Sequence, residues 1–226
     1  MCIRGRLYAT GDLHGDLGRF KSRELRRLRK GDTLFVCGDF GFVWDGSKRE
    51  QRILRRLGRK RYNICFVEGT HDNLELLAQY PQVDFCGGKA KSISGRLYYL
   101  PRGEVYTIEG KRVFTFGGGE SPDVDMRIPG VSWWESELPD ERELAHARQS
   151  LARCQNEVDF IVTHDCASRM RGFIDMETDR QNPLHVFLQE VSDTCRFRLW
   201  VFGCYHLDRR IPPRHAALYK SVLPLE

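Results

Sequence analysis

Five short apolar runs in this chain each end in side chains that can bind a metal ion. The first run, residues 5–10, precedes Asp12 and His14, and the second, residues 34–37, precedes Asp39. Strand side chains alternate with period two, so an acid and an imidazole two residues apart can point to the same side. In open α/β sheets, ligands bind beyond the carboxyl ends of the strands. The pattern therefore predicts one shared site where these strand ends meet.

The remaining three runs repeat the construction later in the chain. Residues 62–67 precede Thr70, His71 and Asp72, residues 158–162 precede His164, and residues 197–202 precede Cys204 and His206. One such histidine is more often a structural residue with satisfied hydrogen bonds. Clustered acids and imidazoles, however, need a shared partner that offsets their desolvation. Mixed carboxylate and imidazole ligands suit Zn, Mn, Fe or Co better than Ca or Mg.

Helical and extended patterns alternate along most of the chain. Helices are predicted over residues 17–29 and 48–60, with a short helix after residue 73, so the first part reads β-α-β-α-β. This order predicts parallel strands joined by right-handed crossovers. Residues 105–108 and 113–116 flank a turn and predict a hairpin. Further helices are expected over 139–154 and 183–191, and a last strand over 215–222.

A long segment between residues 117 and 134 is rich in Gly, Pro, Asp and Trp. Structureless segments of this length inside a domain are usually functional or disordered. Arg127 in this segment is a candidate phosphate ligand, because a guanidinium binds phosphate with two parallel hydrogen bonds. A solvated loop arginine is an equally good interpretation. Arg102 and Arg169 are weaker candidates of the same type.

Length and composition predict one ordinary globular domain spanning residues 1–226. No apolar stretch is long enough to cross a membrane, and no signal peptide is evident, so no membrane association is expected. None of the 8 cysteines forms a C-x-x-C pair. Without a secretion signal, they are expected to be reduced thiols, which favours a cytoplasmic location.

Positive charge is concentrated in the two predicted helices over residues 17–29 and 48–60. Such a concentration can mark a nucleic-acid surface. Two amphipathic helices with solvated outer faces are the favoured interpretation, because the net charge of +5 is modest. No aromatic residues alternate with the basic ones, as single-stranded nucleic acid would require.

The order of these motifs resembles the calcineurin-like metallophosphoesterases. The family pattern D-x-H, G-D, G-N-H-D/E, H and G-H-x-H stands here as Asp12-Leu13-His14, Gly38-Asp39, Gly69-Thr70-His71-Asp72, His164 and Gly203-Cys204-Tyr205-His206. The resemblance covers essentially the whole chain and is strongest to an uncharacterised microbial and phage subgroup. The Asp-Arg-Gly of the protein Ser/Thr phosphatase branch is absent, since the chain has Trp44-Asp45-Gly46.

The resemblance implies an α/β fold, a four-layer α/β/β/α sandwich of two mixed β-sheets flanked by helices. It also implies a hydrolase with two divalent transition metals, Mn, Zn or Fe. Such an enzyme cleaves a phosphate mono- or diester by attack of a metal-activated water. The alternative is a degenerate or single-metal member that only binds phosphate or nucleic acid.

Carried over by position, the family pattern assigns Asp12, His14 and His206 to the first metal, with Asp39 as the bridge. The second metal receives His164 and the residue at position 204. His71 becomes the general acid, or the donor to the leaving oxygen, and Asp72 its orienting partner.

Two positions depart from the family pattern, and both belong to the second metal. Thr70 replaces the Asn, and its hydroxyl is a poorer ligand than an amide oxygen. Cys204 replaces the first His of G-H-x-H, and a thiolate favours Zn or Fe over Mn. Three interpretations remain open. The second site fills with Cys204 and water, the protein works with one metal, or the protein has lost catalysis and only binds a ligand.

Overall fold

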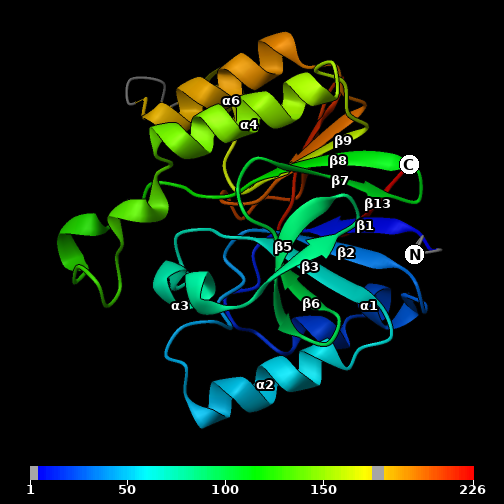
Figure 1. The fold of residues 1–226 in the computed structure, drawn as a ribbon, viewed down its shortest axis with the longest axis vertical. Helices are drawn as coiled ribbons and strands as arrows, with labels where there is room; N and C mark the ends of the chain where they lie inside the picture. Colours follow the sequence, from blue (N-terminus) through cyan, green and yellow to red (C-terminus); the bar gives the residue numbers. More distant parts are fainter. Residues whose placement is uncertain (1–4, 175–180) are drawn as a thin grey trace.

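Two mixed β-sheets lie face to face at the centre of the molecule (Figure 1). The computed structural model describes residues 5–174 and 181–226. The first sheet has seven described strands in the order β13-β1-β2-β3-β6-β5-β4, and the second has six in the order β11-β12-β10-β9-β8-β7. The strands of the first sheet are β1 (Leu7–Thr10), β2 (Thr33–Cys37), β3 (Asn63–Val67), β4 (Gln82–Phe85), β5 (Gly88–Ser94), β6 (Leu97–Tyr99) and β13 (Val222–Leu225). Those of the second are β7 (Glu104–Ile108), β8 (Lys111–Phe116), β9 (Phe160–Thr163), β10 (Leu199–Phe202), β11 (Arg209–Ile211) and β12 (His215–Ala217).

The centre of each sheet is parallel, and its edges are antiparallel. β1, β2 and β3 pair in parallel, as the β-α-β-α-β pattern predicts, and β13 adds to β1 in the opposite direction. In the second sheet β8, β9, β10 and β12 run parallel, while β7 forms the expected hairpin with β8. The carboxyl ends of the parallel strands therefore collect along one edge of each sheet.

Helices cover the outer face of each sheet (Figure 1). On the first sheet lie α1 (Arg23–Arg27), α2 (Lys48–Gly58) and α3 (Leu74–Gln79). On the second lie α4 (Glu141–Arg153) and α6 (Pro183–Thr194), with α5 (Ser168–Arg171) before α6. None of the described helices combines the length and the apolar character that crossing a membrane requires.

The buried apolar side chains form three layers. One lies between the sheets and includes Phe35 and Val201. A second lies under α4 and α6, around Leu144 and Phe187, and a third under the helices of the first sheet, around Leu54. Three apolar layers separate four layers of secondary structure, so the predicted α/β/β/α sandwich is confirmed.

Two predicted elements are wrong in extent. In place of one helix over residues 17–29, the chain forms a short 3₁₀ turn, Arg19–Lys21, and then α1. Ser22 separates them because its extended backbone and its Oγ, which accepts the Leu25 N–H at 3.3 Å, begin a new helix. The strand expected over 215–222 is also divided. The Asp208 carboxylate accepts backbone N–H groups of residues 219–221 and turns the chain from β12 into the other sheet.

Arg102 lies at the end of the first sheet and is almost completely buried. Its guanidinium donates to the Glu68 carboxylate, which follows β3, and to Glu143 of α4 at 2.7 Å. The same group donates to the carbonyl oxygens of Ser136 and Glu137 at 2.8 and 2.9 Å. Arg102 is therefore committed to protein groups and ties β3 to the segment over residues 120–137, so the phosphate-binding interpretation does not fit it.

We predict that Arg102→Met destabilises the fold by about 3–5 kcal/mol, because it leaves the buried Glu68 carboxylate without its partner. Arg148→Met is the matched control. It removes an exposed guanidinium that pairs with Glu190, and such pairs contribute about 0–1 kcal/mol. Urea denaturation measures both. Equal losses in the two variants would show that the Arg102 cluster is not a stabilising contact.

Candidate metal centre

The candidate ligands meet at one end of the two facing sheets, where the carboxyl ends of their parallel strands lie. Each comes from the loop after one parallel strand. These are Asp12 and His14 after β1, Asp39 after β2, His71 after β3, His164 after β9, and Cys204 and His206 after β10. Figure 1 shows β1, β2 and β3 lying side by side beneath β8 and β9. Residues nearly 200 positions apart in the chain are thus brought into one site.

Asp12, His14 and His206 form the most convergent group. The Nε2 atoms of His14 and His206 lie 2.8 Å apart. Asp12 Oδ2 lies 3.2 Å from His206 Nε2 and 3.9 Å from His14 Nε2. Atoms that share one metal at about 2.0–2.2 Å stand roughly 3–3.5 Å from each other, so this group can hold an ion.

The Asp12 carboxylate is buried, and one of its oxygens has no hydrogen-bond partner. Oδ1 accepts the backbone N–H of Cys204 at 3.1 Å, whereas Oδ2 is unsatisfied and faces the two imidazoles. Burial raises the pKa of Asp12 to about 7. A buried polar atom without a partner is unfavourable. A cation at this position would satisfy Oδ2, so the residues present fit a metal ion.

Asp39 lies between the two halves of the centre. Its Oδ2 accepts from His71 Nδ1 at 2.8 Å and lies 3.7 Å from His14 Nε2. Its Oδ1 accepts the His71 backbone N–H at 2.8 Å and lies 3.7 Å from His164 Nε2. Burial alone would raise its pKa, but the nearby His164 and His71 lower it below its usual range. Asp39 thus presents one oxygen toward each side, an arrangement that is open to a bridging carboxylate.

His164 is oriented for ligation on the second side. Its ring Nδ1 lies 3.0 Å from the Cys37 carbonyl oxygen, which can only accept, so Nδ1 carries the proton. Nε2 faces Asp39 Oδ1 at 3.7 Å. Burial lowers the pKa of His164, but Asp39 and Cys204 raise it above its usual range, so Nε2 must give up a proton to bind a metal. Metal-binding histidines usually have their other nitrogen fixed by such a carbonyl.

The rest of the second side is less convergent than the first. Cys204 is half-buried, and burial raises the pKa of its thiol to about 11. Thr70 Oγ1 lies 3.2 Å from His71 Nδ1. Among the described residues, the second group close enough to share an ion is His14, Asp39 and His71, without His164 or Cys204. The predicted ligands of the second metal are therefore near one another but do not close around a single point.

Four candidate ligands have left-handed backbone conformations, which non-glycine residues rarely adopt. The φ angles are 46° at His14, 41° at Asp39, 65° at Cys204 and 50° at His206. Strained backbone of this kind persists where the surrounding structure imposes it, and it concentrates at functional sites. Four described non-glycine residues outside the centre share this conformation, so the backbone supports the side-chain geometry but does not identify the ligands by itself.

Arg127 reaches the centre from the long segment and contacts His71. Its Nη2 lies 3.1 Å from His71 Nε2, and its Nη1 donates to the Thr70 carbonyl at 2.7 Å. A guanidinium can only donate, so His71 Nε2 accepts and the ring proton is on Nδ1, facing Asp39. The side chain is 7% exposed and also pairs with Asp123, so it is not a solvated loop arginine.

Asp72 has a different environment from the one predicted. Its carboxylate accepts backbone N–H groups of Phe40, Gly41 and Gly69, at 3.1, 2.8 and 3.1 Å. Burial raises its pKa to about 7. These bonds hold the loops after β2 and β3 together, while the ring of His71 is oriented by Asp39. Arg169 also lies outside the centre, since it is exposed and pairs with Asp193.

Tyr219 is a contributor that motif spacing does not reveal. Its ring stacks on the His206 ring, with centroids 4.6 Å apart. Arg19 donates to the Tyr219 carbonyl at 2.6 Å and to the Asp12 carbonyl at 2.8 Å. Both contacts join the ligand loops to the carboxyl-terminal part of the chain. No local pattern around Tyr219 or Arg19 signals this, because each acts through a partner distant in sequence.

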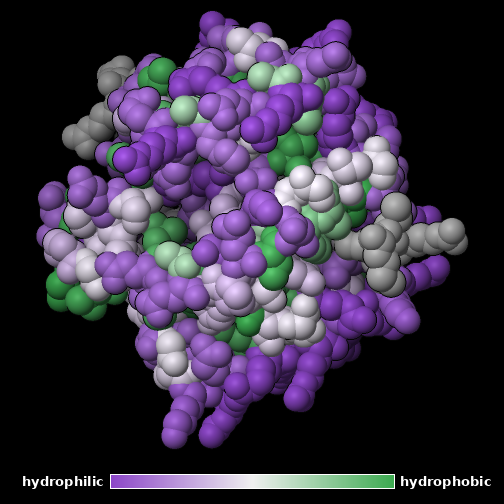
Figure 2. All heavy atoms as spheres, viewed as in Figure 1, coloured by the Kyte–Doolittle hydropathy of each residue, from purple (hydrophilic) through white to green (hydrophobic). Residues whose placement is uncertain are grey.

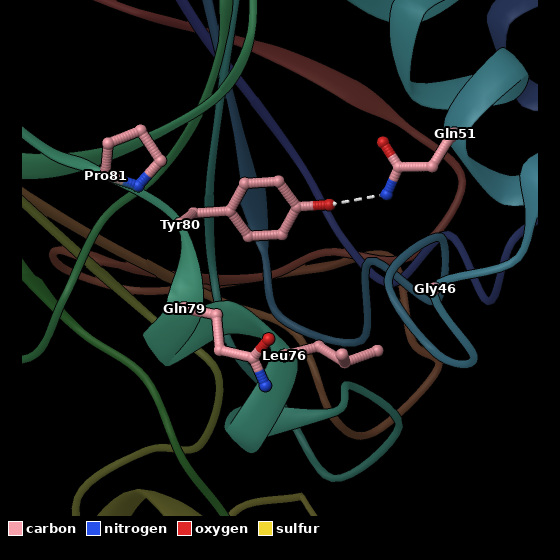
Figure 3. A pocket seen from close by; sticks show the side chains of 6 residues that line it. All are labelled: Gly46, Gln51, Leu76, Gln79, Tyr80 and Pro81. Atoms are coloured by element: carbon pink, nitrogen blue, oxygen red, sulfur yellow. Dashed lines mark hydrogen bonds between the residues drawn. The ribbon is translucent and has the colours of Figure 1, made fainter.

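A separate hollow of about 270 Å³ lies between α2 and α3. Its lining is Gly46, Gln51, Leu76, Gln79, Tyr80 and Pro81. Figure 3 shows the Tyr80 ring crossing it, and its hydroxyl accepts from Gln51 at 3.1 Å. The lining offers no carboxylate, imidazole or basic group, so this hollow has no side chain for acid–base or metal chemistry.

Comparison with known proteins is consistent with this centre. The family model described as calcineurin-like phosphoesterase matches residues 5–203. Among solved structures, the chain is similar to the phosphopantetheinyl hydrolase PptH from Mycobacterium tuberculosis, with 15% identity and a TM-score of 0.43 over 97% of this chain and 91% of that one. No curated protein matches the chain. The family match ends just before Cys204, so the placement of Cys204 and His206 comes from the geometry.

We predict that Asp12→Asn abolishes metal binding without weakening the metal-free fold, because the neutral amide leaves no buried charge unpaired. Thermal unfolding with and without Mn²⁺ or Zn²⁺ measures the effect. The unaltered protein should gain roughly 2–4 kcal/mol at metal concentrations 100- to 1,000-fold above Kd. Asp16→Asn, an exposed acid of the same loop, should keep this gain. Retention of the gain in Asp12→Asn would contradict the assignment of Asp12.

Proposed function

The chain belongs to the calcineurin-like phosphoesterase family, and from this premise we propose that it hydrolyses a phosphate mono- or diester in a metal-dependent reaction. The observation that carries the proposal is the unsatisfied, buried Oδ2 of Asp12, which faces the Nε2 atoms of His14 and His206. No described protein group donates a hydrogen bond to this second carboxylate oxygen. The carboxylate fits a ligand whose metal supplies the missing partner.

We assign the first metal to Asp12, His14 and His206, with Asp39 as the bridge, and the second to His164 and Cys204. Divalent metals held by these residues would lower the pKa of a water molecule and offset the charge of phosphate oxygens. Cys204 carries its proton in the metal-free protein because burial raises its pKa. Metal binding at the second side would therefore release a proton from this thiol.

Arg127 and His71 form the substrate-facing pair in this proposal. With no substrate present, an Arg127 N–H donates to His71 Nε2. Phosphate oxygens accept more strongly from a guanidinium than an imidazole does, so an entering phosphate would take over the Arg127 N–H groups. His71 Nε2 would then be free to hold a proton and deliver it to the leaving oxygen. The hydrogen bond that His71 Nδ1 donates to Asp39 raises the pKa of His71, which favours the protonated ring.

Asp72 acts in this scheme as a positioning residue. It holds the backbone of Gly69 against the loop that carries Asp39, which fixes the position of His71 relative to Asp39. The proton on His71 Nδ1 faces Asp39, so Asp39 orients the ring.

We expect the protein with added Mn²⁺ or Zn²⁺ to hydrolyse an aryl phosphate monoester or diester. With a nitrophenyl ester as substrate, the released nitrophenolate measures the rate. With an alkyl phosphate ester, whose leaving oxygen must be protonated, His71→Asn should lower kcat by about 10²- to 10⁴-fold because the proton donor is lost. Metal content should stay unchanged. His146→Asn, on α4 and outside the centre, is the control. A folded protein that shows no turnover with any divalent metal would refute the proposed activity and leave a binding role.

Elemental analysis of purified protein decides how the second side works. Two metals per chain are expected, with Cys204 as a ligand and Zn or Fe preferred over Mn. The double variant Thr70→Asn with Cys204→His restores the family ligands and should keep two metals while shifting the preference toward Mn. One metal in the native chain that rises to two in the double variant would show instead that this chain has lost its second site.

A further inference from the structure

α2 presents a uniformly basic outer face. Leu54 and Leu57 are buried against the first sheet, and Glu50 is buried because its carboxylate accepts backbone N–H groups of residues 44–46. The exposed positions of the helix and its C-cap are all Lys or Arg, and we call them the basic face: Lys48, Arg49, Arg52, Arg55, Arg56 and Arg59. In Figure 2 long hydrophilic side chains project from the molecule beneath the position of α2 in Figure 1.

The basic face has no internal counter-charges. Within residues 5–174 and 181–226, none of its six side chains lies within ion-pair distance of an acid. Some exposed arginines elsewhere have partners, such as Arg148 with Glu190, and others, such as Arg153, have no ion pair within the described residues. What distinguishes α2 is that six such cations lie together on one helix face.

The spacing of these charges destabilises α2 as long as no counter-charge is bound to it. Lys48, Arg52 and Arg56 succeed one another at intervals of four, and like charges at this spacing destabilise a helix by about 0.2–0.5 kcal/mol per pair. Further basic residues lie between α2 and α1. Arg61 is close enough to α1 to donate to the Arg26 carbonyl at 2.8 Å. Burial lowers the pKa of Lys60, and Arg56 and Arg26 lower it further. A polyanion bound along this face would remove the repulsion.

The chemistry of the face selects among polyanions. The large apolar side chains that are exposed among the described residues are at positions 44, 124, 126, 128, 131, 173 and 186, so none is on α1 or α2. A face without apolar anchors cannot insert into a membrane, and it lacks the apolar core of a protein interface. It also lacks the exposed aromatic rings on which single-stranded bases stack. A regular array of backbone phosphates needs only the cations.

We propose that the basic face of α2 binds the phosphate backbone of duplex nucleic acid without reading its sequence. The helix and its C-cap carry cationic groups along about 16 Å, given a rise of about 1.5 Å per residue. That distance spans several phosphates of a duplex. The face lies on the outer side of the first sheet, and binding there does not depend on hydrolysis at the metal centre.

The test is anisotropy of a labelled random-sequence DNA duplex of about 20 base pairs, titrated with metal-free protein at several salt concentrations. Affinity should fall about 100-fold between about 50 and 200 mM salt. The triple variant Arg52→Glu, Arg56→Glu and Arg59→Glu should bind at least about 100-fold more weakly and lower the salt slope by about three.

The matched control reverses three exposed arginines on other elements, Arg142→Glu, Arg153→Glu and Arg210→Glu. Both triple variants carry the same net charge, so a difference between them cannot come from overall charge. The control residues lie outside the basic face, and the control should therefore keep its affinity within about threefold. If the α2 triple variant does not fold, Arg52→Gln with Arg59→Gln replaces it, with at least about tenfold loss expected. Absence of duplex binding by the unaltered protein at low salt, or equal losses in both triple variants, would overturn the proposal. Retention of the protein on anionic phospholipid vesicles as strongly as on the duplex would overturn it too.

Discussion

The Asp12 carboxylate is the interaction on which the two halves of this molecule depend. It follows β1 of the first sheet, and its Oδ1 accepts the N–H of Cys204, which follows β10 of the second. Gly203 makes this approach feasible, because a Cβ there would lie 2.2 Å from Asp12 Oδ1. One oxygen thus joins the sheets, and the other is left for a ligand.

A second contact between the sheets works in the same way. His164 from the second sheet meets the Cys37 carbonyl of the first at 3.0 Å, and Gly38 leaves room for the imidazole. These two contacts fix the strand ends, and the loops between them adopt left-handed conformations at His14, Asp39, Cys204 and His206. Each such conformation costs about 1–3 kcal/mol. The packing of the two sheets sustains the strain, so the arrangement of Asp12, His14 and His206 is a property of the fold itself.

The alternating pattern of apolar runs was sufficient to predict parallel strands and the strands that carry Asp12, Asp39 and His164, whereas the four-layer sandwich was implied by the resemblance of the motifs to the family. Period and strand direction are properties of short segments, so they can be read locally. The interruption at Ser22 and the turn at Asp208 depend on single side-chain to backbone hydrogen bonds, which periodicity does not report. Asp72 and Arg102 look like site residues in the sequence, but their environments are backbone N–H groups and buried carboxylates. Only tertiary structure shows those partners. The stacking of Tyr219 on His206 is invisible for the same reason.

The metal-binding role of Asp12 is tested most directly by a crystal structure of the protein grown with Mn²⁺ or Zn²⁺, with anomalous scattering recorded at the absorption edge of the metal. An anomalous peak is expected about 2.0–2.3 Å from Asp12 Oδ2 and His206 Nε2. A second is expected beyond Asp39 toward His164, about 3.5–4 Å from the first. A map at saturating metal with no peak beside Asp12 Oδ2, and with that oxygen hydrogen-bonded to a protein group, would contradict the role assigned to Asp12.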